Sequence, residues 1–172
     1  MTRTYDSSRR KAEAQRTRRR ILDHAVELHR EGNTAYEPLA EAAGVSTATV
    51  RKHFPNKEAI FQGCTHHFFE TFELPDLEAA AKLTNARDRT AYVTAEMCKA
   101  HEQIHDLLWH TYAEAAASTA ITHAIEQYAA LVDAAAATVA EGPGISGNRD
   151  ATRRRVRALL DPLTYRAFRV QV

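Results

Sequence analysis

The chain has 172 residues, and its 23 Lys and Arg nearly balance its 22 Asp and Glu, leaving a formal net charge of +1. A charge so near zero identifies no partner. Apolar residues make up 44% of the chain, with only 6 Gly and 5 Pro, which excludes disorder and low complexity as general descriptions. The length allows one ordinary domain or two small ones.

Two features bear on where the protein works. Cys64 and Cys98 are its two cysteines, too few for a disulfide framework. The first 20 residues are basic without an apolar run, and nowhere do 18 consecutive apolar residues occur, so neither a secretory signal nor a membrane span is predicted. We expect a cytoplasmic protein without a membrane partner, and we predict no cofactor.

Three helices are predicted in the first third of the chain. Over residues 17–30 the apolar residues recur at three- and four-residue spacing, as on one face of a helix. A very short helix follows over residues 38–43, and Gly44 suits the left-handed residue past its end. Ser46 is predicted to cap a third helix, which Pro55 ends.

The rest of the chain is also predicted to be helical. Residues 57–72 are amphipathic, residues 76–87 form a short helix and a turn, and further helices span residues 88–118, 119–140 and 150–160. Three glycines make residues 142–147 a loop, and Pro162 is expected to interrupt the last helix. No convincing β-alternation occurs, so we predict an all-α fold.

The second and third helices have the pattern of a helix-turn-helix, whose second helix enters the DNA major groove. Apolar residues are expected to pack these helices together: Leu39, Ala40, Ala43, Val45 and Val50. Small donors and cations are expected outside: Thr47, Ala48, Thr49, Arg51, Lys52 and His53. Such side chains can reach base edges and phosphates, because Thr can hydrogen-bond or offer its methyl group and Arg can pair with guanine through two hydrogen bonds.

The segment AGVSTATVRKHFPNKEAIF at residues 43–61 resembles the signature of the TetR family of one-component regulators, and TRRRILDHAVEL at 17–28 resembles the family's first helix. The resemblance covers residues 15–72. It implies a basic, flexible arm at 1–14, an N-terminal three-helix helix-turn-helix domain at 15–57 and a helical-bundle domain for effector binding and dimerisation at 58–172. The implied partners are double-stranded operator DNA, a second copy of the chain and an unidentified small molecule.

The resemblance also implies which residues contact DNA: Thr34, Ser46, Thr47, Ala48, Thr49, Arg51, Lys52, His53 and Lys57. Residues 47–49 are implied to lie near bases or the sugar-phosphate backbone, and Lys52, His53 and Lys57 near phosphates. Lys57 also opens a helix, whose N-terminal amides favour an anion. The family usually has Tyr where this chain has Arg51, so a charge replaces a hydroxyl and the base preference stays open.

The first twenty residues allow two interpretations of their cations: Arg9, Arg10, Lys11, Arg16, Arg18, Arg19 and Arg20. They could form a solvated, disordered tail or an arm that follows a DNA groove. Residues 1–57 carry 12 basic and 7 acidic side chains, a net of +5, whereas residues 58–172 carry 11 and 15, a net of −4. The near-zero net charge is thus the sum of two unlike segments. This division predicts a basic DNA-facing module joined to an acidic domain that phosphates would repel.

Residues 101–105, HEQIH, satisfy the HExxH pattern of zinc peptidases, with His101 and His105 on one helical face. That chemistry needs Zn²⁺ on both imidazoles, Glu102 as general base and a third protein ligand. No extended HExxHxxGxxH follows, so we predict that the chain is not an enzyme. A metal-responsive regulator that uses the two histidines stays open as an alternative, and a zinc hydrolase as a weaker one.

A helical wheel places six residues on one face of the predicted helix 88–118: Ala91, Ala95, Cys98, Leu108, Trp109 and Tyr112. His101 and His105 fall near the middle of that face, where buried imidazoles need partners. They are either satisfied core histidines or part of an effector pocket. The expected pocket residues are Cys64, Phe68, Phe72, Met97, His101, His105, Leu108, Trp109 and Tyr112. A ligand there would act by shifting the helix that begins at Lys57.

The resemblance thus implies a homodimeric, sequence-specific transcriptional regulator, expected to be a repressor that a small molecule releases from its operator. A nonspecific architectural DNA binder stays open, because it would show no operator preference. The dimer interface is expected on two apolar stripes: Ile125, Tyr128, Val132, Ala135 and Val139, and Val156, Leu159, Leu160 and Leu163. Since the chain reaches Val172 soon after Pro162, we expect that interface to be small or unusual.

Overall fold

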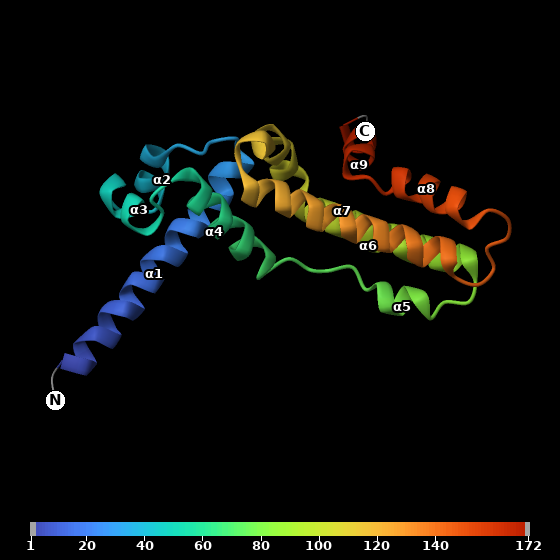
Figure 1. Ribbon diagram of the computed structural model, residues 1–172, viewed down its shortest axis with the longest axis horizontal. Helices are drawn as coiled ribbons and strands as arrows, with labels where there is room; N and C mark the ends of the chain where they lie inside the picture. The colour runs from blue at the N-terminus through green and yellow to red at the C-terminus, as the bar shows by residue number, and fades with distance from the viewer. Residues whose placement is uncertain (1–2, 171–172) are drawn as a thin grey trace. The chain divides into compact units, whose positions relative to one another are not determined.

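The computed structural model describes residues 3–170, and within them every regular element is a helix (Figure 1). The predicted all-α fold is confirmed. The chain divides into two compact units, Met1–Thr71 with Trp109–Thr122, and Phe72–Leu108 with His123–Val172.

The first unit contains four helices of the N-terminal region: α1 (Arg3–Arg30), α2 (Tyr36–Ala42), α3 (Thr47–His53) and α4 (Lys57–Phe69). In it α4 packs against α1, and α2 packs against both α1 and α3. The unit therefore includes α4, which the predicted division after Lys57 assigned to the second domain.

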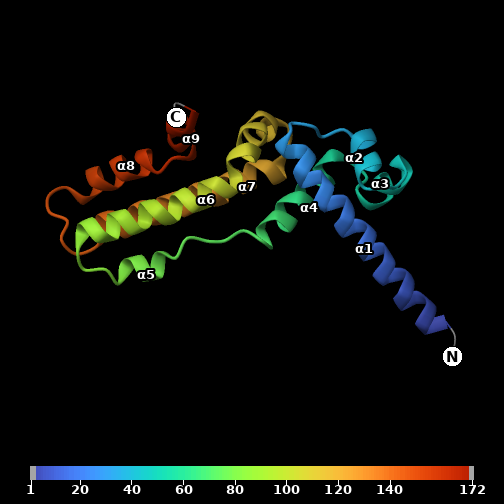
Figure 2. The ribbon, with the colours of Figure 1, turned by 180° about the vertical axis from the view of Figure 1, so that it is seen from behind.

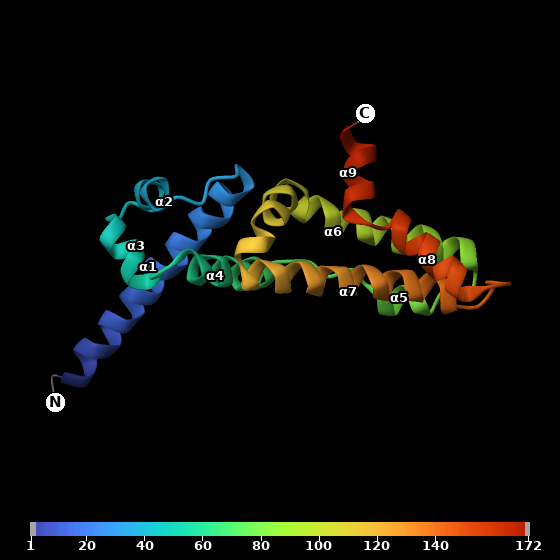
Figure 3. The same ribbon diagram turned by 45° about the horizontal axis from the view of Figure 1, so that its top comes forward.

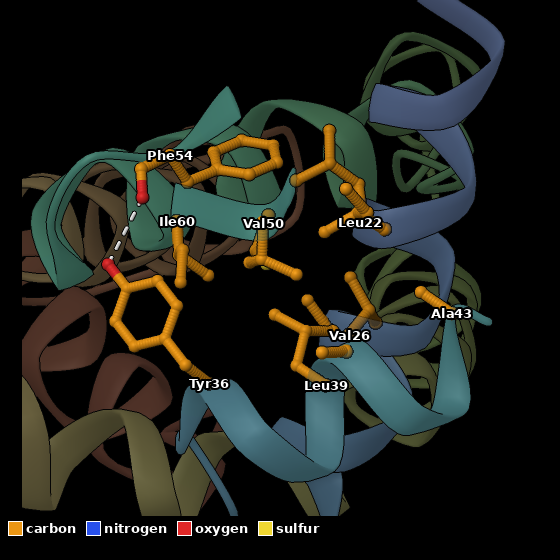
Figure 4. Packing of buried hydrophobic residues seen from close by; sticks show 12 residues of the cluster. Leu22, Val26, Tyr36, Leu39, Ala43, Val50, Phe54 and Ile60 are labelled. Atoms are coloured by element: carbon orange, nitrogen blue, oxygen red, sulfur yellow. Dashed lines mark hydrogen bonds between the residues drawn. The ribbon is translucent and has the colours of Figure 1, made fainter. Parts of the chain in front are cut away.

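Apolar side chains from α1 to α4 meet in one core (Figure 4): Ile21, Leu22, Ala25, Val26, Tyr36, Leu39, Ala40, Ala43, Val50, Phe54, Ile60 and Cys64. Helices as short as α2 and α3 are not stable alone in water, so burial of these residues holds them in place. The hydroxyl of Tyr36 also donates to the carbonyl oxygen of Phe54 at 3.1 Å, which ties the start of α2 to the end of α3.

The helix α1 begins earlier than the sequence predicts. It starts at Arg3 rather than Thr17, so the segment predicted as a flexible arm is helical from Arg3 onwards. The side chains of residues 7–16 are all exposed. Because this part of α1 buries no apolar stripe, apolar periodicity cannot reveal it.

The remaining elements are α5 (Leu77–Ala81), α6 (Ala86–Glu114), the 3-10 helix η1 (Ala115–Ala117), α7 (Thr119–Glu141), α8 (Arg149–Leu159) and α9 (Pro162–Val170). The helices α6 and α7 contribute residues to both units. The predicted interruption near Pro162 is confirmed, because α8 ends at Leu159 and a separate helix, α9, follows. Pro162 is the first residue of α9, where its missing N–H and fixed φ are compatible with a helix.

The buried face of α6 differs from the wheel prediction. It consists of Arg89, Val93, Met97, Ala100, His101, Ile104 and Leu108. Ala91 and Ala95 are exposed, and the exposed fraction is 55% for Trp109 and 36% for Tyr112. The prediction is wrong for these four residues. Alanine has little apolar area to bury, so Ala91 and Ala95 are weak indicators of which face of α6 is buried, and relying on them placed the buried face incorrectly.

The apolar stripe of α7 is buried within the chain, whereas the sequence predicts it at the dimer interface. Tyr128, Val132, Ala135 and Val139 are each at most 6% exposed. The stripe is therefore part of the chain's own interior and does not present these side chains to a second copy. Leu159 and Leu163, from the second predicted stripe, are exposed.

Candidate nucleic-acid interface

The turn before α3 and the cap of α3 set the direction of this helix. Gly44 has a φ of +61°, in the left-handed region that favours glycine. The side-chain oxygen of Ser46 accepts a hydrogen bond from the backbone N–H of Thr49 at 3.1 Å, so the predicted N-cap is confirmed. Val50 and Phe54 are fully buried and fix the inner face of the helix.

The outer face of α3 carries the residues predicted to contact DNA. Ala48, Arg51 and Lys52 are exposed, and Thr47 and Thr49 are half-buried. The hydroxyls of Ser46 and Thr49 lie 2.9 Å apart and hydrogen-bond each other. The Ser46 hydroxyl is therefore engaged in capping α3, and the most exposed side chains of the helix are those of Ala48, Arg51 and Lys52.

Arg51 does not project freely from α3. Its guanidinium carbon lies 4.3 Å from the centre of the Tyr36 ring, a cation–π contact. Tyr36 thus braces α3 twice, through this contact and through its hydrogen bond to Phe54. Sequence reasoning missed Tyr36, because an aromatic residue at the start of a short helix gives no signal beyond apolar character.

Arg18 of α1 holds the other end of α3. One of its guanidinium nitrogens donates to the carbonyl oxygen of His53 at 3.2 Å, and its guanidinium carbon lies 4.3 Å from the centre of the Phe54 ring. Burial, followed by the charges of Arg18 and Lys52, lowers the pKa of His53. The signal for Arg18 was available, because it lies one helical turn before Leu22 on the same face of α1.

Lys57 and Thr34, both predicted to meet phosphate, lie together. The ammonium of Lys57 donates to the hydroxyl oxygen of Thr34 at 3.1 Å. Lys57 is the first residue of α4, and Asn56 caps that helix by accepting from the N–H of Ala59 at 2.8 Å. The cation, the hydroxyl and the helix terminus all favour an anion at this place.

Residues 21–64 match the sequence profile of the bacterial regulatory proteins of the tetR family. The match begins within α1, includes the whole of α2 and α3, and ends within α4. Residues 21–64 therefore form a DNA-binding domain of the TetR type. The chain is accordingly a DNA-binding transcriptional regulator whose N-terminal helices form the helix-turn-helix domain. A search of curated proteins and a search of solved structures each found no match.

The residues predicted to line the effector pocket divide between the two units. The first unit contains Cys64, Phe68, Trp109 and Tyr112, and the second contains Phe72, Met97, His101, His105 and Leu108. Met97, His101 and Leu108 are buried as predicted. His105 is half-buried and Phe72 packs edge-on against Tyr128, with ring centres 6.1 Å apart.

Cys64 lines a small cavity in the first unit, with Ala25, Leu28, His29, Asn33, Thr34, Ala35, Leu39, Ile60 and Phe61. The cavity volume is about 10 Å³, which suits one water molecule rather than an effector. Burial raises the pKa of Cys64 to about 12. His29 is 6% exposed, and its Nε2 has no hydrogen-bond partner among the described residues.

His101 is a satisfied core histidine, one of the two interpretations that the sequence left open. Its Nε2 lies 3.0 Å from the carbonyl oxygen of Leu160, and its Nδ1 lies 2.7 Å from the hydroxyl of Tyr128. Because a carbonyl only accepts, Nε2 carries the proton and Nδ1 accepts from the Tyr128 hydroxyl. Burial lowers the pKa of His101, which favours this neutral form.

The other members of the HExxH motif also have partners within the second unit. Glu102 accepts from the hydroxyl of Tyr165 and the guanidinium of Arg169, both on α9, and these bonds lower the pKa of Glu102. His105 Nε2 lies 2.6 Å from a carboxylate oxygen of Asp106. Over residues 3–170 no group of three or more His, Cys, Asp and Glu is arranged to hold a metal ion. The motif therefore attaches α9 to α6.

None of the helices in the described part of the chain is both long and apolar enough to cross a membrane.

Proposed function

We propose that this protein is a sequence-specific repressor, which binds operator DNA as a homodimer and is released by a small molecule. The observation that carries the proposal is the construction of α3. Its inner face is locked by Val50 and Phe54, its ends are held by Ser46 and Arg18, and its outer face presents Arg51 and Lys52. A rigid helix that presents cations is suited to the major groove.

Dimer formation is supported by apolar residues on α8 and α9. The exposed fractions are 67% for Leu159, 47% for Leu163 and 66% for Phe168. The two helices contact each other, so these side chains can join in one surface. A second copy would bury them, and a twofold dimer would present two α3 helices to two half-sites.

Release by an effector is supported by two contacts in the first unit. The backbone N–H of Ala120, in the first turn of α7, donates to a carboxylate oxygen of Glu58 in α4 at 2.8 Å. The His110 ring of α6 lies so close to Gly32 that a Cβ there would be 2.6 Å from it. A ligand that moves α6 or α7 would therefore displace α1 or α4, which carry α3.

The experiment that tests this function is selection of bound duplexes from a random DNA pool by the full chain. We expect enrichment of an inverted repeat whose half-sites lie about 10 base pairs apart or a multiple of that, because two α3 helices must enter the groove from one side. Recovery of no common sequence would overturn specific recognition and favour a nonspecific DNA binder. Small molecules that bind the protein but leave affinity for the selected duplex unchanged would contradict release.

A further inference from the structure

We propose that residues 7–20 of α1 form a second DNA-binding element, the helical extension, which contacts phosphates flanking the half-site that α3 occupies. The inference rests on the proposed function, because it requires α3 to lie in the major groove. The family match begins at residue 21, so the helical extension lies outside it.

The composition of the helical extension fits a polyanion. It carries seven cations: Arg9, Arg10, Lys11, Arg16, Arg18, Arg19 and Arg20. Glu13 is its one acidic residue, and its apolar residues are the two alanines Ala12 and Ala14. Without large apolar side chains it cannot insert into a membrane surface, so its charge is the property that a partner would recognise.

The helical extension gains no stability from burial over residues 7–16, which are all exposed. In Figures 1, 2 and 3 this half of α1 stands away from α2, α3 and α4 of the same unit. Isolated helices of this length are marginal in water, and Arg16 lies three and four residues before Arg19 and Arg20, a like-charge spacing that weakens a helix further. An anionic partner would neutralise these charges and remove that repulsion. Binding of the partner would therefore stabilise the helical form of the helical extension.

The helical extension is continuous with the candidate interface. Arg18 is attached to the end of α3 through His53 and Phe54. Burial lowers the pKa of His53, and the charges of Arg18 and Lys52 lower it further, so the electric fields of α1 and α3 overlap at His53. The direction of the helical extension is therefore fixed relative to α3 by a contact at its base.

The length of the helical extension matches a DNA flank. From Arg18 back to Arg9 is nine residues, or about 14 Å of helix at 1.5 Å per residue. Since base pairs rise by about 3.4 Å, this length corresponds to roughly four base pairs of duplex beyond the end of α3. Phosphates over that span are within reach of cations that are distributed around the helix.

The test compares two charge variants of the full chain on two duplexes. The first variant is Arg9→Gln/Lys11→Gln/Arg16→Gln, and the matched control is Lys82→Gln/Arg87→Gln/Lys99→Gln, an equal loss of charge at exposed positions of the second unit outside α8 and α9. Both duplexes contain the sequence selected from the random pool, with flanks of about 10 base pairs in one and about 2 in the other, chosen from the reach of the helical extension. Thermal unfolding of both variants checks that they fold like the wild type.

On the long duplex we expect the first variant to bind at least tenfold more weakly near 100 mM salt, with a salt slope less steep by about 2 to 3, one unit for each lost phosphate contact. On the short duplex it should bind like the wild type, and the control should match the wild type on both. Equal losses on both duplexes, or no loss on either, would overturn the helical extension as a flank-binding element while leaving recognition by α3 standing. If the wild type selects no sequence, the proposed function and this inference both fail.

Discussion

The two units place their polar side chains in opposite ways. In the first unit the cations and hydroxyls of α3 and α4 lie outside a largely apolar core. In the second unit Arg89, fully buried, donates to the carbonyl oxygens of Leu83 at 2.7 Å and Pro143 at 2.6 Å. His101, also buried, is held by a carbonyl and a hydroxyl. Substitutions on the outer faces of α3 and α4 should therefore alter DNA binding, whereas substitutions of these buried polar groups should alter stability.

The largest effect is expected at Arg89, whose buried guanidinium donates to the carbonyl oxygens of Leu83, Val139 and Pro143. We expect Arg89→Met to lower the free energy of unfolding by about 3 kcal/mol or more, because hydrogen bonds from a charged donor contribute about 1.5–3 kcal/mol each. Denaturation by urea measures the free energy of unfolding of the variant and of the wild type. Arg87→Met, at an exposed position of the same helix, is the control. Equal stability of the two variants would show that Arg89 is not a structural element of the second unit.

A smaller loss is expected at Tyr128. Tyr128→Phe removes the hydroxyl that His101 Nδ1 accepts from, and a buried group left without a partner costs about 1–3 kcal/mol. The control is Tyr92→Phe, which alters a hydroxyl on a side chain that is 36% exposed. Thermal unfolding of both variants compares them. An unchanged melting temperature for Tyr128→Phe would contradict the assignment of His101 as a satisfied core histidine.

Replacement of Ser46 should lower both the stability of the first unit and its affinity for DNA. Ser46→Ala removes the cap of α3 and should cost about 1 kcal/mol of stability. It should also weaken binding to the selected duplex, because in the proposed complex the N-terminal turn of α3 enters the groove. Ser146→Ala, in an exposed loop of the second unit, should change neither. A variant that keeps full stability and affinity would show that the cap is dispensable.

The smallest effect is expected from the protonation of His29. Burial, against the opposing charge of Glu114, lowers its pKa, so the unfolded chain takes up the proton first as the pH falls. Its contribution to stability is complete above about pH 6.5 and is lost as the pH falls through the lowered pKa. His29→Gln should make the fall in melting temperature between pH 7.5 and pH 5 shallower, as read at about half-unit steps. His123→Gln, at an exposed histidine, should leave the profile unchanged.

The sequence predicts best what depends on neighbouring residues. The helix α3, its Ser46 cap and the turn at Gly44 follow from local chemistry and are confirmed. The burial of Arg89 could not be predicted, because its partner Pro143 is 54 residues away and a carbonyl leaves no mark in the sequence. The same holds for His101 and Leu160, 59 residues apart.

The site shows the same division. The cations of α3 and α4 could be proposed from residue type, whereas the packing of Arg51 on Tyr36 depends on how α2 and α3 meet. The helical part of α1 before Thr17 carries no apolar periodicity and so escapes detection. The exposure of Trp109 was missed because the face of α6 was inferred from small residues that bury little area.

The most direct test of the account is a parallel selection from one random DNA pool by the wild type, Arg51→Ala and Lys52→Ala. If α3 reads the sequence, Arg51→Ala should enrich a different set of bases from the wild type, whereas Lys52→Ala should enrich the same sequence with lower affinity and a salt slope less steep by about 1. Identical sequences from all three proteins, or none from any, would contradict recognition by the outer face of α3.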